Sequence, residues 1–192
     1  VFALNDDIYH TDGTMNPWNG PHAVFMVFKD DGATTNYRTI YSSQVSAGDR
    51  YGLMFRASNR RLHLTEPGVS GDDSVDEFTS GGPGQLSFVT AAGVSGGTIT
   101  GNAYFDGVVD SGGALSNSGY SAATNTGFRL GTVGYVDSGL AYTVAEVIVL
   151  DYEPTVAERQ RIEGYLAHKW GITSRLPARH PFKDTPPYTG PW

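Results

Sequence analysis

The chain has 192 residues, 39% of them hydrophobic and 12% aromatic, which is enough for one folded domain with a sizeable core. Its 25 glycines and 10 prolines argue against a helical bundle, and the absence of cysteine excludes disulfides and thiol chemistry. The formal net charge is −7, and the acidity lies in residues 1–152, so the basic footprint of a nucleic-acid-binding protein is missing.

Most of residues 1–152 alternates between apolar and polar positions, the pattern of β-strands. The run at 22–28 is almost continuously apolar and predicts a strand buried on both faces. β-Branched and aromatic residues predict further strands at 37–41, 51–55, 61–66, 85–89, 102–105, 128–130 and 144–150. Glycine-rich stretches are expected to be loops at 80–84, 93–101 and 111–119. So many strands with little helix predict an all-β sandwich or barrel.

One helix is predicted between Thr155 and Gly171. Thr155 can cap its first turn, and Glu158 three residues later completes a capping box. One face, at the i, i+3, i+4, i+7, i+8 spacing, holds Ile162, Tyr165, Leu166, Lys169 and Trp170. We expect this face to pack on a sheet, with Trp170 buried. Gly171 suits the position after the helix, and the prolines beyond it predict an extended tail.

The sequence lacks the patterns of common catalytic sites. Glu146 and Asp151 are five residues apart, so a regular strand would place them on opposite faces, unlike the paired carboxylates of a retaining glycosidase. Residues 93–97 match Gly-x-Ser-x-Gly, but β-like residues follow them where a hydrolase needs a helix. The five histidines lack the i, i+4 spacing of a zinc helix and are expected to be structural. We therefore expect no enzyme.

Calcium is the one metal that the sequence favours, because this ion prefers several oxygen ligands. The densest acidic loop spans 71–77 and offers Asp72, Asp73 and Asp76 as a candidate calcium site. The alternative is that these carboxylates are solvated turn residues. No other cofactor is expected.

The C-terminal third carries the most specific signal. Residues 145–151, 158–160, 162–171 and 176–181 resemble the last strand, helix and tail of the concanavalin A-like lectin/glucanase superfamily, in its laminin-G-like branch of bacterial and phage proteins. The Asp106-Gly107 turn resembles a hairpin of the same family, and residues 2–9 its first strand. The Glu-x-Asp-x-x-Glu string of the superfamily's hydrolases is absent.

The resemblance implies an antiparallel jelly-roll β-sandwich over residues 1–152, a helix docked on it at 153–171 and an extended tail at 172–192. It also implies a functional range: lectins, sugar-binding modules, glycan hydrolases and lyases, and structural parts of virions. Because one fold hosts many functions, the site residues must choose among these.

Several side chains could bind a sugar, which needs an aromatic surface for its apolar face and planar polar groups for its hydroxyls. Strand candidates are Tyr37, Arg38, Tyr51 and Arg56, and loop candidates are Trp18, Tyr120 and Tyr135. Trp18 is flanked by two asparagines, an unusual choice for a loop without a partner. The alternative for each aromatic is a place in the core.

We therefore expect a non-catalytic, lectin-like module that binds a glycan or polysaccharide, as part of a larger extracellular or virion-surface protein. Val1 in place of Met also leads us to expect a piece of a longer protein. The alternative is a structural phage component, such as a capsid-decoration, fibre or tail protein, that packs against virion or self subunits. A polysaccharide hydrolase or lyase comes third. No membrane insertion is expected, since no apolar run approaches ~18 residues.

Overall fold

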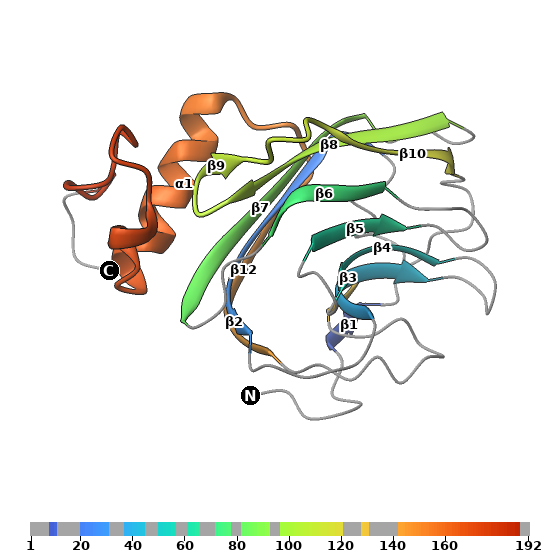
Figure 1. Ribbon diagram of the computed structural model, residues 1–192, viewed down its shortest axis with the longest axis horizontal. Helices are drawn as coiled ribbons and strands as arrows, with labels where there is room; N and C mark the ends of the chain where they lie inside the picture. Colours follow the sequence, from blue (N-terminus) through green and yellow to red (C-terminus); the bar gives the residue numbers. More distant parts are fainter. Residues whose placement is uncertain are drawn as a thin grey trace.

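The protein is an antiparallel β-sandwich with one helix packed on its outside (Figure 1). The computed structural model describes residues 8–10, 20–30, 37–44, 50–56, 61–65, 72–77, 82–92, 97–120, 128–130 and 142–188. This architecture confirms the predicted all-β sandwich with a C-terminal helix. No helix within the described ranges is long and apolar enough to cross a membrane.

Two sheets form the sandwich, and every pair of neighbouring strands is antiparallel. Sheet A contains, in spatial order, β1 (Ile8–His10), β11 (Phe128–Leu130), β3 (Tyr37–Gln44), β4 (Arg50–Arg56), β5 (Arg61–Thr65) and β6 (Asp72–Glu77). Sheet B contains β10 (Leu115–Tyr120), β8 (Gly97–Phe105), β7 (Pro83–Ala92), β2 (His22–Asp30) and β12 (Tyr142–Leu150), with β9 (Val108–Val109) paired to β8.

Strand β2 lies between β7 and β12 in sheet B and is buried on both faces, as its apolar run predicts. Val24, Met26 and Phe28 belong to the core between the two sheets. Phe25 and Val27, on the opposite face, pack under the helix in a second apolar cluster. The sequence is apolar at consecutive positions because each face of this strand meets a different layer.

Part of the glycine-rich sequence lies in strands, so the loop prediction is wrong there. Residues 97–101 belong to β8, 83–84 to β7 and 115–119 to β10. Gly101 pairs with Thr90 on one side and Leu115 on the other. Ladder hydrogen bonds from two neighbouring strands outweigh the weak intrinsic preference of glycine for strands.

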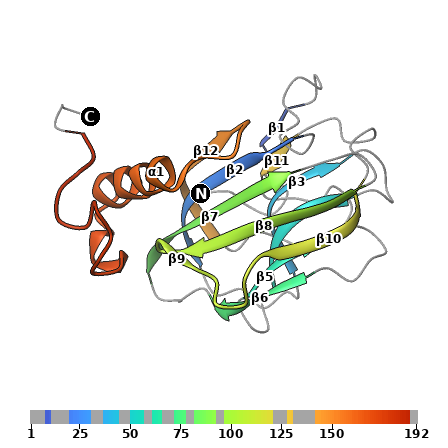
Figure 2. The ribbon, with the colours of Figure 1, turned by 90° about the horizontal axis from the view of Figure 1, so that it is seen from above.

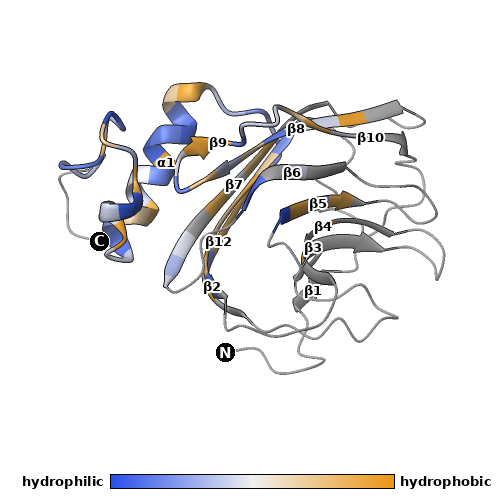
Figure 3. Ribbon diagram, in the orientation of Figure 1, coloured by the Kyte–Doolittle hydropathy of each residue, from blue (hydrophilic) through white to orange (hydrophobic). Residues whose placement is uncertain are grey.

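The helix α1 (Val156–Lys169) begins and ends where its capping residues predict. The Thr155 side chain accepts from the Glu158 N–H, while the Glu158 carboxylate accepts from the Thr155 N–H at 2.9 Å. Gly171 follows the last turn with φ +68°, a conformation that favours glycine. Figure 3 shows that the middle of α1 is strongly hydrophilic.

The face of α1 that meets sheet B is only partly the predicted one. Leu166 is buried and Ile162 and Tyr165 pack against the same apolar cluster, as predicted, whereas Lys169 and Trp170 are exposed. The buried helix residues are Arg159, Glu163, Gly164, Leu166 and Ala167. The prediction that Trp170 is buried is wrong, since this residue is 40% exposed. Compared with the predicted orientation, the helix is rotated about its axis so that Arg159 and Glu163 face the sheet. Their burial is possible because the two charges neutralise each other.

The segment after α1 turns back beside the helix (Figure 1), and Figure 2 shows the same segment at the helix end that lies away from the sheets. It begins with a short 3-10 turn, Thr173–Arg175. Arg175 Nε lies 2.9 Å from Asp106 Oδ2, at the turn that joins β8 to β9. Asp106 and Gly107 have φ of 51° and 81°, which confirms the predicted Asp-Gly hairpin turn. Lys183 Nζ donates to three carbonyls, those of Thr173, Ser174 and Leu176.

Candidate functional site

The predicted sugar-binding residues of the strands lie on two neighbouring strands of sheet A. Tyr37 in β3 and Arg56 in β4 are register partners, although 19 positions separate them in the sequence. Arg38 and Tyr51 lie on the same two strands. The side chains of these four residues are outside the described part, as is that of Tyr120 in β10. Trp18 and Tyr135 lie wholly outside the described residues.

Asp76, a predicted calcium ligand, lies on strand β6, so the prediction of a loop at 71–77 is wrong for residues 72–77. Hydrogen bonds join Asp76 to the segment between β9 and β10. Its carboxylate accepts from the N–H of Ser111 at 2.6 Å and from the Ser111 hydroxyl at 2.8 Å. Its own N–H donates to Asp110 Oδ1 at 2.7 Å. Among the described side chains, no group of three His, Asp or Glu lies close enough to hold a metal. The side chains of Asp72 and Asp73 are outside that set, so calcium stays a prediction.

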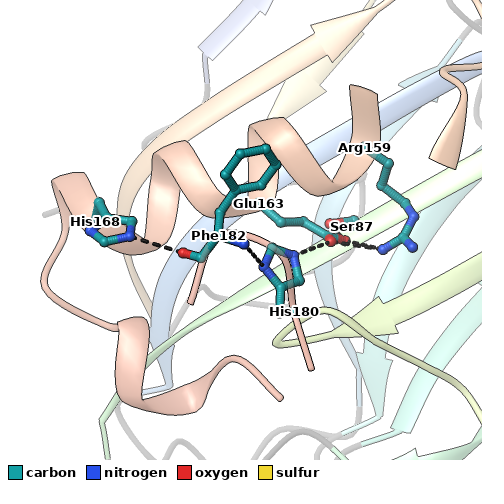
Figure 4. A network of polar contacts seen from close by, with 6 residues as sticks. All are labelled: Ser87, Arg159, Glu163, His168, His180 and Phe182. Atoms are coloured by element: carbon teal, nitrogen blue, oxygen red, sulfur yellow. Dashed lines mark hydrogen bonds and ion pairs between the residues drawn. The ribbon is translucent and has the colours of Figure 1, made fainter. Parts of the chain in front are cut away.

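A buried polar network joins α1, the tail and sheet B (Figure 4). Glu163 is its centre and is fully buried. Its carboxylate lies 2.6 and 2.7 Å from Arg159 Nη1, accepts from the Ser87 hydroxyl at 3.0 Å, and lies 3.3 Å from His180 Nε2. The Arg159 guanidinium also stacks on the Tyr104 ring, 3.8 Å from its centroid. Every oxygen of the buried carboxylate therefore has charged or polar partners.

The proton of His180 is fixed by its neighbours. The Phe182 N–H donates to His180 Nδ1 at 3.3 Å, so Nε2 carries the proton that Glu163 accepts. The Phe182 carbonyl in turn accepts from His168 Nε2 at 2.9 Å. The Phe182 ring packs against Gly164, where a Cβ would overlap it. These contacts hold the tail on the helix.

This network cannot work as a nucleophilic triad. The Ser87 hydroxyl donates to Glu163 and not to His180, so these side chains lack the serine–histidine contact of such a triad. All three side chains are buried, so substrate could not reach them. Sequence reasoning missed the network, although the i, i+4 spacing of Arg159 and Glu163 was a signal that could have indicated it.

An exposed group of aromatic and charged side chains lies where α1 ends. We call it the Trp170 cluster, and it consists of Glu146, Tyr165, Lys169, Trp170 and Tyr188. Glu146, on β12, accepts from Trp170 Nε1 at 2.7 Å, from Lys169 Nζ at 3.1 Å and from the Tyr165 hydroxyl at 3.2 Å. The rings of Tyr165 and Tyr188 meet edge to face, with centroids 6.5 Å apart. Lys169 Nζ lies 5.2 Å from the Tyr165 centroid and 5.8 Å from that of Trp170.

The charges of this cluster are stabilised by each other. Partial burial raises the pKa of Glu146, but the hydrogen bonds from Trp170, Lys169 and Tyr165 outweigh it and leave that pKa below its usual value. The hydrogen bonds with Tyr165 and Glu146 raise the pKa of Lys169. The carboxylate and the ammonium are therefore both charged at neutral pH, and the pair carries no net charge.

Comparison with solved structures supports the sandwich fold. A Trypanosoma rangeli sialidase is similar over 88% of this chain, with TM-score 0.60 and 12% sequence identity. Domain 4 of AbnA, a GH43 extracellular arabinanase from Geobacillus stearothermophilus, in complex with arabinotriose, is similar over 79% of this chain and 69% of its own, with TM-score 0.58 and 17% identity.

No family model and no curated protein matches this sequence. The chain spans 27% of the sialidase, about a quarter of that protein's length. At these identities the similarities show the fold alone, which is a two-sheet antiparallel β-sandwich. Membership of the concanavalin A-like superfamily, and of its laminin-G-like branch, stays a prediction.

Proposed function

We propose that this chain is a non-catalytic module that recognises a glycan, as part of a larger extracellular or virion-surface protein. The observation that carries the proposal is the pairing of Tyr37 with Arg56 on sheet A. Register partners on neighbouring antiparallel strands share one face of the sheet. Tyrosine and arginine are the residue types that supply the two kinds of contact a sugar needs, an apolar surface and planar hydrogen-bond donors.

The position of α1 favours sheet A for this role. The helix and the tail lie on the side of sheet B that faces away from sheet A (Figures 1 and 2). The outer face of sheet A is thus the sheet face that these elements leave open. Domain 4 of AbnA, solved with arabinotriose, supports the proposal because a sandwich of the same fold can hold a short oligosaccharide.

Binding of soluble oligosaccharides by the full chain tests this function. We expect saturable binding to at least one member of a glycan array, confirmed by calorimetric titration with and without calcium. Tyr37→Ala and Arg56→Ala should each weaken it at least tenfold, whereas Arg161→Ala, an exposed change on α1, should leave it unchanged. Circular dichroism checks that each variant is folded.

A clean negative array, both with and without calcium, would refute glycan recognition. Self-assembly of a chain that binds no glycan, detected by light scattering, would instead support the structural phage component. Release of reducing ends from a polysaccharide would contradict the non-catalytic role.

A further inference from the structure

We propose that the Trp170 cluster is a second sugar-contact surface, specific for a neutral glycan. The inference rests on the proposed function and adds a site on the opposite side of the molecule from the open face of sheet A. The first observation is the solvent exposure of two aromatic residues. Trp170 is 40% exposed and Tyr188 52% exposed, and both are large aromatic side chains in one cluster.

The orientation of the indole explains what it presents to solvent. Indole has a single polar atom, Nε1, and Glu146 accepts its hydrogen bond at 2.7 Å. The rest of the indole ring is hydrocarbon. Exposed aromatic carbon is unfavourable in water, and a sugar that stacks on it would cover that surface.

The cluster is rigid before any ligand arrives. Glu146 comes from β12, while Tyr165 and Lys169 come from the last turns of α1 and Trp170 is the cap residue that follows, so one carboxylate fixes three side chains at the end of the helix. Lys169 Nζ also donates to the Tyr165 hydroxyl at 2.8 Å. A site that is already ordered loses little conformational freedom when it binds.

The charges select the class of ligand. Lys169 is balanced by Glu146 at 3.0 Å, so the cluster offers no surplus positive charge to an acidic sugar. The hydroxyl of Tyr165 and the ammonium of Lys169 can hydrogen-bond sugar hydroxyls at the edge of the rings. A neutral pentose or hexose chain fits this combination, and a uronic or sialic acid does not.

Nitrogen-labelled full-length protein provides a residue-level test by NMR titration. The probes are arabinotriose, xylotriose and cellotriose, with trigalacturonic acid as the acidic comparison. The indole N–H of Trp170, assigned by its loss in Trp170→Phe, should shift in a saturable way with at least one neutral probe. Trp170→Ala should weaken that binding at least fivefold, and Trp170→Phe, which keeps an aromatic ring, should recover most of it.

Tyr152→Ala is the matched control, since Tyr152 is 45% exposed but lies outside the cluster. It should change affinity less than twofold. The Tyr37→Ala/Arg56→Ala double variant, which disables sheet A, should keep the Trp170 shift.

An unmoved Trp170 signal while sheet A still binds would overturn this inference and leave the proposed function standing. Loss of all sugar binding in the wild-type chain would overturn both. Tighter binding of trigalacturonic acid than of every neutral probe would refute the ligand class, and equal losses in Trp170→Ala and Tyr152→Ala would refute the site.

Discussion

Replacement of Glu163 by alanine should be among the most damaging single changes to the stability of this protein. The carboxylate is fully buried and has Arg159, Ser87 and His180 as partners. Removing it leaves the Arg159 guanidinium, itself buried, without a counter-charge. Breaking a buried ion pair from one side costs about 3–5 kcal/mol, because the remaining charge stays desolvated. We expect a loss of about 4 kcal/mol.

The same reasoning predicts smaller losses for two further variants. Glu163→Gln keeps the shape and one acceptor but turns an N–H toward His180 Nε2, which already carries a proton. Like Glu163→Ala it leaves the Arg159 guanidinium without a counter-charge, but it keeps one hydrogen-bond acceptor for that group, so its loss should be somewhat smaller than that of Glu163→Ala. Arg159→Met combined with Glu163→Leu removes both charges together and should cost less than Glu163→Ala alone.

Urea unfolding followed by far-UV circular dichroism and tryptophan fluorescence measures these free energies. Coincident transitions would show that the helix and the sandwich unfold together. A loss below about 1 kcal/mol for Glu163→Ala, when an intact buried pair requires several times more, would refute the reasoning. The reasoning would also be refuted if the double variant lost as much free energy of unfolding as Arg159→Met and Glu163→Leu lose separately, added together.

Three further changes test other parts of the fold. Gly164→Ala should lower the free energy of unfolding by about 1–3 kcal/mol, since the new methyl would overlap Phe182. Alanine is the better helix former, so a higher free energy of unfolding in urea denaturation would contradict the packing of Phe182 on Gly164. Burial lowers the pKa of His22 to about 4, so the unfolded chain binds more protons between that value and 6.5, and stability should fall by about 3 kcal/mol as the pH drops through this window. Urea titrations at several pH values should show that His22→Asn loses less stability than the wild-type chain as the pH drops through this window. If the two proteins show the same pH dependence, His22 is excluded as the source of the loss. Asn117 is 3% exposed, and within the described part neither amide atom has a hydrogen-bond partner. Asn117→Val should therefore raise the thermal midpoint, with a gain of about 1–2 kcal/mol, and a lower midpoint would indicate that the amide is satisfied by a bound water.

Local sequence signals predicted the helix and most strands of this fold, but they missed β6 and β10. The capping box at Thr155, the turn at Asp106 and the doubly buried strand at 22–28 each depend on neighbours within a few residues. The rotation of α1 was not predictable in this way. It depends on a charged pair whose burial becomes favourable only when Ser87 and His180 arrive from distant parts of the chain.

The candidate site was predictable only in part, for a similar reason. The sequence identified Tyr37 and Arg56 as separate candidates, and only the register of β3 and β4 makes them neighbours. Trp170 was assigned to the core because apolar spacing cannot show that Glu146 binds its N–H at the surface. The resemblance to known helix and tail sequences also has a structural explanation here, since Gly164, His180 and Lys169 each hold the tail or the helix end in place.

The docking of α1 on sheet B has a practical consequence for anyone who expresses pieces of this protein. A recombinant fragment that stops at residue 152 would keep every described strand but lose the cover over Phe25, Val27 and Val89. That fragment would present a continuous apolar face to its neighbours in the cell and would be prone to aggregate. The shortest useful fragment extends through Lys183, whose ammonium group closes the tail on itself.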